Sequence, residues 1–475
     1  MIEKTIEKTY EEWKRNALAD DARSGANSWK EEEYSELYDS KVIRLRYDEL
    51  TKLRASGDLQ GLLYFFNEGI HGNMGGMGAP KLYTHSKFGT KKLIVDYVNE
   101  LAAAIDQLAQ CSDREISHQE KLEVFRRSSG CFGRSAIMLS GAGPLGPFHI
   151  GVVKSLWEQN LLPNIISGAS AGAVVTAMVG TRHNQYVSDL FSGGSLSDLV
   201  QLLSEYAELL QTRVPTSNKH LVEMIASLIP DMTFVEALEE SGRYINIPVA
   251  PVKMQQRSRL LNAMTSPNVL IRDAVLASCS IPGIFPSVTL AAKDHTGKRR
   301  PYVPSRKWVD GSITNDLPAK RLARQYSVNY FLSSQANPMV MWALQNTAQR
   351  SDPWSRYMNI YQSAARDWMR AIYPLTMEMI PITHPANANV RMLFDLMTQE
   401  YTADITILPK RRFYNMGQLL LPLSSDETSA LIKEGEQSTW PSIEQIRNNT
   451  VISRKLDSVL RDLEGGAQLA VLSAA

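Results

Sequence analysis

The chain has 475 residues, of which 44% are hydrophobic and 21% are charged, so it can form a large buried core. This composition is typical of globular proteins and excludes a largely disordered chain. The formal net charge of +1 at pH 7 gives no overall attraction for nucleic acid, and no nucleic-acid partner is expected.

The three cysteines are widely spaced and form no CxxC motif, which predicts isolated reduced thiols rather than a disulfide framework or a zinc site. Reduced thiols are typical of a cytoplasmic protein. The first residues are highly charged, unlike a signal peptide, and no uncharged apolar run reaches about 18 residues, so no transmembrane helix is expected. A lipid substrate would therefore be reached from the water side.

Residues 1 to about 130 have apolar side chains at helical spacing and are predicted to be mostly helical. A loop with four glycines, at residues 71–78, interrupts this region. From residue 134 onward, short apolar runs are followed by glycine turns and helical segments, which predicts an α/β domain with a mainly parallel sheet. The expected strands are residues 135–139, 165–168, 244–249, 330–333 and 405–408, and the expected helices include 148–159 and 171–179.

The first candidate for chemistry is Ser170, in the sequence GASAG between a predicted strand and a predicted helix. Gly168 and Gly172 would allow the close backbone approach that a nucleophilic serine on a sharp turn requires. The helix N-terminus adds positive potential, which stabilises a developing oxyanion. The alternative is a chance GxSxG match in an ordinary turn. With the strand–turn–helix context, the nucleophile interpretation and this alternative are about equally supported.

A second glycine turn, SGAGPLG at residues 140–146, lies between a predicted strand and a predicted helix. Successive backbone N–H groups in such a turn can point at one oxygen, as an oxyanion hole requires. The same residues match the dinucleotide pattern GxGxxG, but the acidic residue expected at the end of the next strand is missing. A phosphate-binding loop would also need a lysine that is absent here, so the oxyanion interpretation is favoured.

Asp310 precedes Gly311 and could serve as a base, either directly or by orienting a histidine. Taken alone, the pair is better explained as an ordinary Asp-Gly turn. A Ser…Asp…His order would require His384, the only histidine after Asp310, which lies in a proline-flanked segment. His149, just inside the helix after the second glycine turn, is expected to pack or to orient rather than to act as a base.

Together, these three elements resemble the patatin-like phospholipase family, whose pattern is a glycine-rich oxyanion loop, a GxSxG serine and a later Asp-Gly pair. The resemblance covers roughly residues 135–335. Further segments resemble the subgroup with an accessory N-terminal domain, which includes fungal triacylglycerol lipases of lipid droplets and bacterial relatives. These segments are residues 47–101, 259–270, 277–286 and 401–407.

The resemblance implies a three-layer α/β/α patatin-like core with a mainly parallel sheet, preceded by a mostly helical N-terminal domain. The expected domains are residues 1–130, the catalytic core at 131–335, and a C-terminal extension at 336–475 that is partly packed on the core. Within that extension, Trp354–Tyr373 is rich in aromatic and basic residues, and membrane contact and core packing are equally expected for it.

By the same resemblance, Ser170 attacks the ester carbonyl, and Asp310 takes its proton and later activates water. Gly141, Ala142 and Gly143 would supply the oxyanion N–H groups, with no metal and no cofactor. Alanine stands at 142 where the family usually has glycine, which requires a negative φ there. Two other departures are Leu145, where many relatives have a cation, and Ser312 after Asp310-Gly311.

The expected function is a serine lipid acyl hydrolase that cleaves carboxylic esters of phospholipids or acylglycerols. Two alternatives are open at this point: a lysolipid acyltransferase that uses the same acyl-enzyme, and a non-catalytic lipid-binding protein. The expected partner is a lipid substrate, met at a membrane or lipid-droplet surface from the cytoplasm. The oligomeric state is left open.

Overall fold

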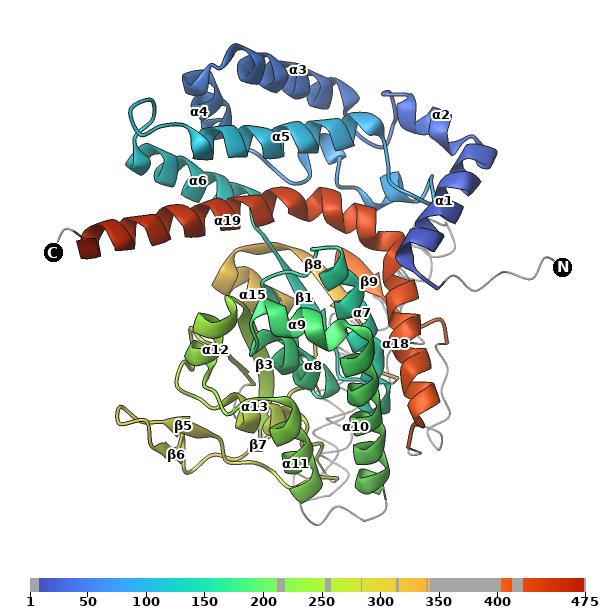
Figure 1. Ribbon diagram of the computed structural model, residues 1–475, viewed down its shortest axis with the longest axis vertical. Helices are drawn as coiled ribbons and strands as arrows, with labels where there is room; N and C mark the ends of the chain where they lie inside the picture. The colour runs from blue at the N-terminus through green and yellow to red at the C-terminus, as the bar shows by residue number, and fades with distance from the viewer. Residues whose placement is uncertain are drawn as a thin grey trace, which may run out of the picture. The chain divides into compact units, whose positions relative to one another are not determined.

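The computed structural model describes residues 8–211, 218–252, 258–282, 284–312, 316–338, 341, 403–411 and 422–473 (Figure 1). The chain forms two compact units. The helical unit comprises Met1–Ser135, Ala323–Tyr330 and Trp440–Ala475, and the sheet unit comprises Ala136–Leu322 and Phe331–Thr439. Trp354–Tyr373 and His384 lie outside the described residues. No helix in the described ranges has both the length and the apolar character needed to cross a bilayer.

The helical unit confirms the prediction of a mostly helical N-terminal region. Side-chain caps explain where several helices begin: Asp39 and Asp58 accept backbone N–H groups at two N-termini, and Ser117 and Glu120 form a capping box at a third. The helices are α1 (Tyr10–Ser24), α2 (Ala26–Glu31), α3 (Ser40–Ser56), α4 (Leu59–Asn67), α5 (Lys92–Gln110), α6 (His118–Phe132) and α19 (Ile443–Ser473).

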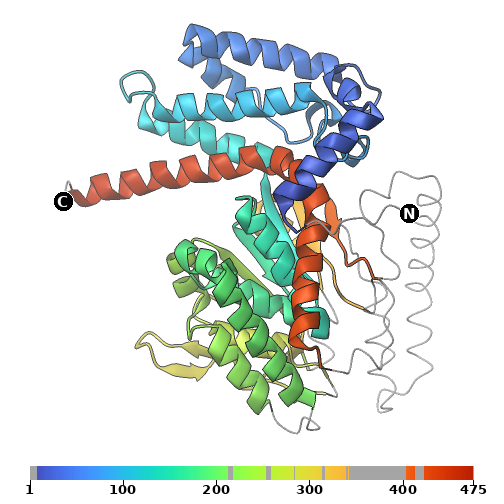
Figure 2. The same ribbon diagram turned by 45° about the vertical axis from the view of Figure 1, so that its right-hand side comes forward.

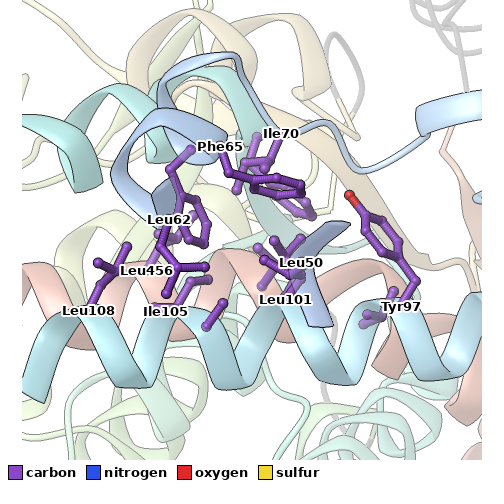
Figure 3. Close-up of a cluster of buried hydrophobic side chains, with 14 of the residues drawn as sticks. Leu50, Leu62, Phe65, Ile70, Tyr97, Leu101, Ile105, Leu108 and Leu456 are labelled. Atoms are coloured by element: carbon purple, nitrogen blue, oxygen red, sulfur yellow. The ribbon is translucent and has the colours of Figure 1, made fainter. Parts of the chain in front are cut away.

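Helix α5 supplies much of the core of the helical unit (Figure 3). Tyr97, Leu101, Ile105 and Leu108 recur at intervals of three or four residues, so they lie on one face of the helix. They join apolar side chains from α3 and α4, together with Leu456 from α19. The last helix of the chain therefore completes a core that the first 130 residues begin.

The glycine-rich loop at residues 71–78 lies in a tightly packed part of the helical unit. Gly75 has φ +55° and its carbonyl accepts the Asp39 N–H at 2.7 Å, beside the start of α3. A Cβ atom at Gly78 would lie only 2.7 Å from Asn449 Oδ1 in α19. The glycines are therefore explained by close packing between α3, the loop and α19.

The described strands of the sheet unit form a seven-stranded sheet in the order β4-β3-β2-β1-β8-β9, with β7 also paired to β3. The pairs β1–β2, β2–β3 and β8–β9 are parallel, whereas β4 and β7 run antiparallel to β3. The strands are β1 (Arg134–Leu139), β2 (Ile165–Gly168), β3 (Tyr244–Pro251), β4 (Arg259–Leu261), β7 (Trp308–Asp310), β8 (Val328–Ser334) and β9 (Ile405–Ile407). A separate antiparallel pair comprises β5 (Ala291–Lys293) and β6 (Arg299–Pro301).

Helices pack on this sheet, so the predicted α/β core with a mainly parallel sheet is confirmed. All five predicted strands are present, with ends shifted by a few residues. The antiparallel strands β4 to β7 are absent from the sequence-based expectation because each of them is only three residues long. The helices are α7 (Pro147–Glu158), α8 (Ala171–Gly180), α9 (Asn184–Phe191), α10 (Gly193–Gln211), α11 (Lys219–Leu228), α12 (Phe234–Ser241), α13 (Ile271–Ser278), α15 (Ala319–Tyr326) and α18 (Ser425–Thr439).

Helix α18 lies alongside α7 (Figure 2), and two glycines bring their backbones close together. A Cβ atom at Gly151 of α7 would lie 1.8 Å from the Ile432 carbonyl oxygen, and one at Gly435 of α18 would lie 2.2 Å from the Phe148 carbonyl oxygen. Part of the segment after residue 335 is thus packed on the helix that follows the SGAGPLG turn.

Candidate active site

Ser170 occupies the sharp turn between β2 and α8 with φ +51° and ψ −121°, a backbone conformation that side-chain-bearing residues rarely adopt. The turn leaves no room for side chains on either side of it. A Cβ atom at Gly168 would lie 2.1 Å from the Gly172 carbonyl oxygen, and one at Gly172 would lie 2.4 Å from the Leu139 carbonyl oxygen. Both flanking glycines are therefore required by the geometry of this turn.

Hydrogen bonds from the end of α13 hold the Ser170 backbone in this conformation. The Ser170 N–H donates to the Ser278 hydroxyl at 3.1 Å, and that hydroxyl donates to the Pro248 carbonyl at 3.0 Å. The Cys279 thiol lies 3.3 Å from the Ser170 carbonyl oxygen. These contacts offset backbone strain that costs on the order of 1–3 kcal/mol.

Asp310 ends β7 and is buried, with 1% of its surface exposed. Its Oδ1 accepts the Ser312 N–H at 2.8 Å, and the Ser170 side chain lies close enough to lower the pKa of the same carboxylate. Burial raises the pKa of Asp310 to about 6, against the opposing effect of Ser312 and Ser170. Because β7 pairs with β3, the next residue, Gly311, has no room for a side chain. A Cβ atom there would lie 2.2 Å from the Pro248 carbonyl oxygen.

The turn after β1 contains the three predicted oxyanion donors. Ala142 has φ −138°, so alanine fits there without strain, and Gly143 has φ +52°. The Gly141 N–H donates to Asp316 Oδ1 at 2.6 Å and is therefore already committed in this structure. No hydrogen bond from the N–H groups of Ala142 or Gly143 is found within the described residues. Of the three predicted donors, Ala142 and Gly143 are therefore the two whose N–H groups are not already bonded within the described residues.

His149, one turn into α7, is completely buried and contacts Ser140 and Ser334 rather than Asp310. Because the Ser140 carbonyl can only accept, Nε2 donates to it at 3.0 Å and Nδ1 accepts the Ser334 hydroxyl at 2.7 Å. Burial lowers the pKa of His149 to about 4, so the ring is neutral. This geometry suits an orienting residue, which holds the start of the turn that contains Ala142.

A cavity of about 340 Å³ lies beside Ser170. Apart from the polar groups near Ser170, its lining is dominated by aliphatic, methionine and phenylalanine side chains from α7, α8, α10 and α11, from the loop after α13 and from the start of α18. Such a lining fits a hydrocarbon chain next to a reactive hydroxyl. The lining includes Ile150, Val174, Met178, Leu221, Met224 and Phe285.

Sequence reasoning missed the residues that support the turn and form the cavity. Ser278 lies 108 positions from Ser170 in the chain, and Asp316 lies 175 positions from Gly141. No local motif marks Asp316, whereas Ser278 lies in the segment 277–286 that resembles the family subgroup, but its contact with Ser170 was not predicted. For the cavity, the spacing of Val174 and Met178 on the helix after the GxSxG turn was an available signal, since both lie on one helical face.

Comparison with known proteins agrees with this fold and these motifs. Residues 137–323 match the patatin-like phospholipase family, and residues 3–130 match a domain of unknown function, DUF3336. The chain therefore contains a patatin-like phospholipase domain, preceded by this additional N-terminal domain. The resemblance inferred from the sequence is confirmed.

Several relatives match nearly the whole chain, triacylglycerol lipases among them. Triacylglycerol lipase 4 of Saccharomyces cerevisiae is 33% identical over 96% of this chain and 52% of its own length. Triacylglycerol lipase 5 of the same yeast is 30% identical over 96% of this chain and 64% of its own. Triacylglycerol lipase SDP1L of Arabidopsis thaliana is 30% identical over 94% and 57%. The chain thus spans less than two thirds of the length of each of these relatives.

Proposed function

We propose that this protein is a serine lipid acyl hydrolase that cleaves carboxylic esters of acylglycerols or phospholipids. The observation that carries the proposal is the buried Asp310 carboxylate next to Ser170, which sits on a strained strand-to-helix turn beside an apolar cavity. The names of the relatives support triacylglycerol as the first substrate to test.

In the proposed acylation step, Ser170 Oγ attacks the ester carbonyl while its proton passes to Asp310. The negative charge that forms on the carbonyl oxygen is stabilised by the N–H groups of Ala142 and Gly143 and by the N-terminus of α8. The C–O bond to the alcohol then breaks. The leaving alkoxide takes the proton from Asp310, and an acyl-enzyme on Ser170 remains.

In the proposed deacylation step, a water molecule attacks the acyl-enzyme and transfers a proton to Asp310. The new C–O bond forms as the bond to Ser170 Oγ breaks, and Ser170 regains its proton from Asp310. The products are a fatty acid and the free enzyme. An alcohol in place of water would give acyl transfer instead, so product analysis distinguishes the hydrolase from an acyltransferase.

The experiment is to incubate the purified full chain with an emulsion of triacylglycerol and phosphatidylcholine and to identify the products by mass. We expect released fatty acid from the wild-type protein. We expect a loss of at least about 1000-fold in Ser170→Ala and Asp310→Asn, since removing one member of such a unit removes most of the chemistry. Asp273→Asn is the matched control, because Asp273 is another buried aspartate of the sheet unit, paired with Arg299.

Three results would contradict the proposal. A folded wild-type protein that releases no product from any ester is not a hydrolase. Activity that survives Asp310→Asn but is lost in His384→Ala would instead favour a Ser–His mechanism. Acyl transfer to an added lysolipid, without fatty acid release, would favour the acyltransferase.

We also propose that the sheet unit meets a membrane or lipid-droplet surface at the side of the cavity formed by α10, α11 and the loop after α13. This is supported by three large apolar side chains that are exposed on these elements: Leu209, Val222 and Ile284 are 43%, 45% and 46% exposed. The same elements supply Leu203, Leu221 and Phe285 to the cavity. Exposed apolar residues next to such a cavity mark a surface that binds lipid.

Flotation with triolein emulsion tests this surface. Val222→Glu combined with Ile284→Glu should shift the protein from the floating fraction to the soluble one and lower emulsion activity about 10-fold or more. Hydrolysis of a water-soluble short-chain ester should be unchanged. Leu45→Glu is the matched control, since Leu45 is 69% exposed but belongs to the helical unit. Equal flotation of all variants would contradict the assignment.

A further inference from the structure

Asp316 is a second buried carboxylate near the proposed active site, six residues after Asp310 and outside the Ser–Asp pair. It is 1% exposed. Its Oδ1 accepts the Gly141 N–H at 2.6 Å, a shorter contact than the two made by its Oδ2. Its Oδ2 lies 3.4 Å from Asn337 Nδ2 and 3.5 Å from Gln335 Nε2. All three donors are neutral groups.

The position of Gly141 explains why this contact matters for the turn. Gly141 directly precedes Ala142 and Gly143, whose N–H groups are the remaining oxyanion donors. The space next to Gly141 is also filled, because a Cβ atom there would lie 2.9 Å from Ser312 Cβ. One side of the turn therefore rests on the segment that follows Asp310, and Asp316 makes the hydrogen bond between them.

The same end of the turn is also held through Ser140, the residue directly before Gly141. The Ser140 hydroxyl accepts the Ala336 N–H at 2.9 Å, and the Ser140 carbonyl accepts His149 Nε2–H at 3.0 Å. Ala336 lies just after the end of β8, and so do Gln335 and Asn337, whose side chains donate to Asp316. Asp316 thus joins the oxyanion turn to both the β7 and the β8 ends of the sheet.

We propose that Asp316 is a positioning residue that fixes the oxyanion turn by holding the Gly141 N–H, so that Ala142 and Gly143 present their N–H groups to the reacting carbonyl. This rests on the proposed function and deepens it. Oxyanion donors act only if they are already oriented when charge develops, and a misplaced donor costs about 100-fold to 1000-fold in rate. The effect therefore falls on kcat rather than on substrate binding.

The chemistry of the side chain makes a clear distinction between two substitutions. Asparagine keeps a carbonyl oxygen that can accept the Gly141 N–H, whereas alanine leaves that N–H without an acceptor. We expect Asp316→Ala to lower kcat about 100-fold with KM changed less than about 3-fold. We expect Asp316→Asn to restore kcat to within about 10-fold of the wild type.

The experiment measures kcat and KM on a soluble short-chain ester, together with the rate at which a fluorophosphonate labels Ser170. Thermal unfolding of each variant tests folding, and Asp273→Ala is the matched control. Asp273 is also buried and accepts a backbone N–H, from Ala291 at 3.0 Å. Asp273→Ala should lower stability but keep kcat within about 3-fold of the wild type.

Each outcome supports or overturns the inference. A fall in kcat and in labelling rate for Asp316→Ala, with rescue by asparagine, supports it. Equal kcat in Asp316→Ala and the wild type overturns it. The inference is also overturned if, across all three variants, the loss of kcat simply parallels the fall in melting temperature. If the wild-type protein hydrolyses no ester, the proposed function fails instead. The labelling rates of folded Asp316→Ala and wild type then still test the turn. Phosphonylation of Ser170 develops negative charge on a phosphoryl oxygen, which takes the place of the ester carbonyl oxygen beside the turn.

Discussion

Burial of Asp310 determines the pH range in which Ser170 can react. Only the ionised carboxylate accepts the serine proton, and burial raises its pKa to about 6. We therefore expect kcat/KM for a soluble ester to fall about tenfold per pH unit below pH 6 and to level off above it. A pH–rate profile checks this. A limb centred near pH 4 would show that the carboxylate is not desolvated in the working enzyme.

The same burial has a cost in stability, and its sign follows from proton linkage. Burial raises the pKa of Asp310 to about 6 and that of Asp316 to about 7, so the folded protein binds more protons than the unfolded chain between about pH 4 and pH 7. Stability contributed by these groups is therefore present at low pH and is lost as the pH rises through this window.

Asp310→Asn should consequently stabilise the protein at pH 7.5 and leave stability unchanged at pH 4. One pKa unit corresponds to about 1.4 kcal/mol, so a rise from 3.8 to about 6 corresponds to a gain on the order of 3 kcal/mol. Urea unfolding at the two pH values measures it. Asp294→Asn is the control of opposite sign, because hydrogen bonds from Thr296 and Arg300 lower the pKa of Asp294. A gain of equal size at both pH values would contradict the explanation.

At the scale of single elements, helix α8 has Ser170 at one end and the buried Arg243 guanidinium at the other. Arg243 is 4% exposed and donates to the carbonyls of Val179 and Arg182 at 3.1 and 2.9 Å. Burial lowers its pKa to about 10, which leaves it charged at neutral pH. A cation at the C-terminus of a helix is favourable for the same reason that an oxyanion is favourable at the N-terminus.

Arg243→Met should cost about 2–4 kcal/mol, since three hydrogen bonds from a charged donor are lost, and the carbonyls of Val179 and Arg182 and the Asn184 side chain lose their partner. Urea unfolding measures the loss. The substitution leaves Ser170 and Asp310 unchanged, so kcat per folded molecule should stay within about threefold of the wild-type value. A large loss of kcat in a variant of unchanged stability would contradict this expectation. It would show that the charge of Arg243 acts on the reaction at Ser170 through α8.

The close contact between α7 and α18 predicts that neither glycine tolerates a side chain. Gly435→Ala should destabilise the sheet unit by at least about 2 kcal/mol, because the added methyl group meets backbone atoms rather than a flexible side chain. Activity on long-chain esters should fall as well, since the start of α18 lines the cavity. Gly130→Ala in α6, where a Cβ atom meets nothing within 4 Å, is the control and should be neutral or stabilising.

The elements around Ser170 were predictable because glycine spacing and apolar runs are local properties of the sequence. Asp310 was predictable only through its position in a family pattern, since one Asp-Gly pair has many explanations. The role of Asp316, the contact of Ser278 with Ser170 and the cavity were not predictable, because each depends on segments that are far apart in the chain. The domain boundaries placed after residues 130 and 335, and the catalytic roles of the site residues, stay predictions.

At the scale of the whole molecule, the helical unit depends on the last helix of the chain. Leu456 is fully buried among side chains of the N-terminal helices. Leu456→Ala should destabilise the helical unit by about 2–5 kcal/mol, as other large-to-small core substitutions do. Limited proteolysis should then cleave within residues 8–130 first. Leu18→Ala, at a residue that is 39% exposed, is the control and should not change the cleavage pattern.

This shared core has a consequence for synthesis on the ribosome. Roughly three hundred residues separate Ser135 from Ile443, the first residue of α19. At about 5–20 residues per second, translation of this stretch takes about 15 to 60 s. During that time the N-terminal helices have left the ribosome with part of their apolar surface uncovered. The nascent chain should therefore be a substrate for chaperones that bind exposed apolar segments, and slow translation of the sheet unit should lower the yield of folded protein.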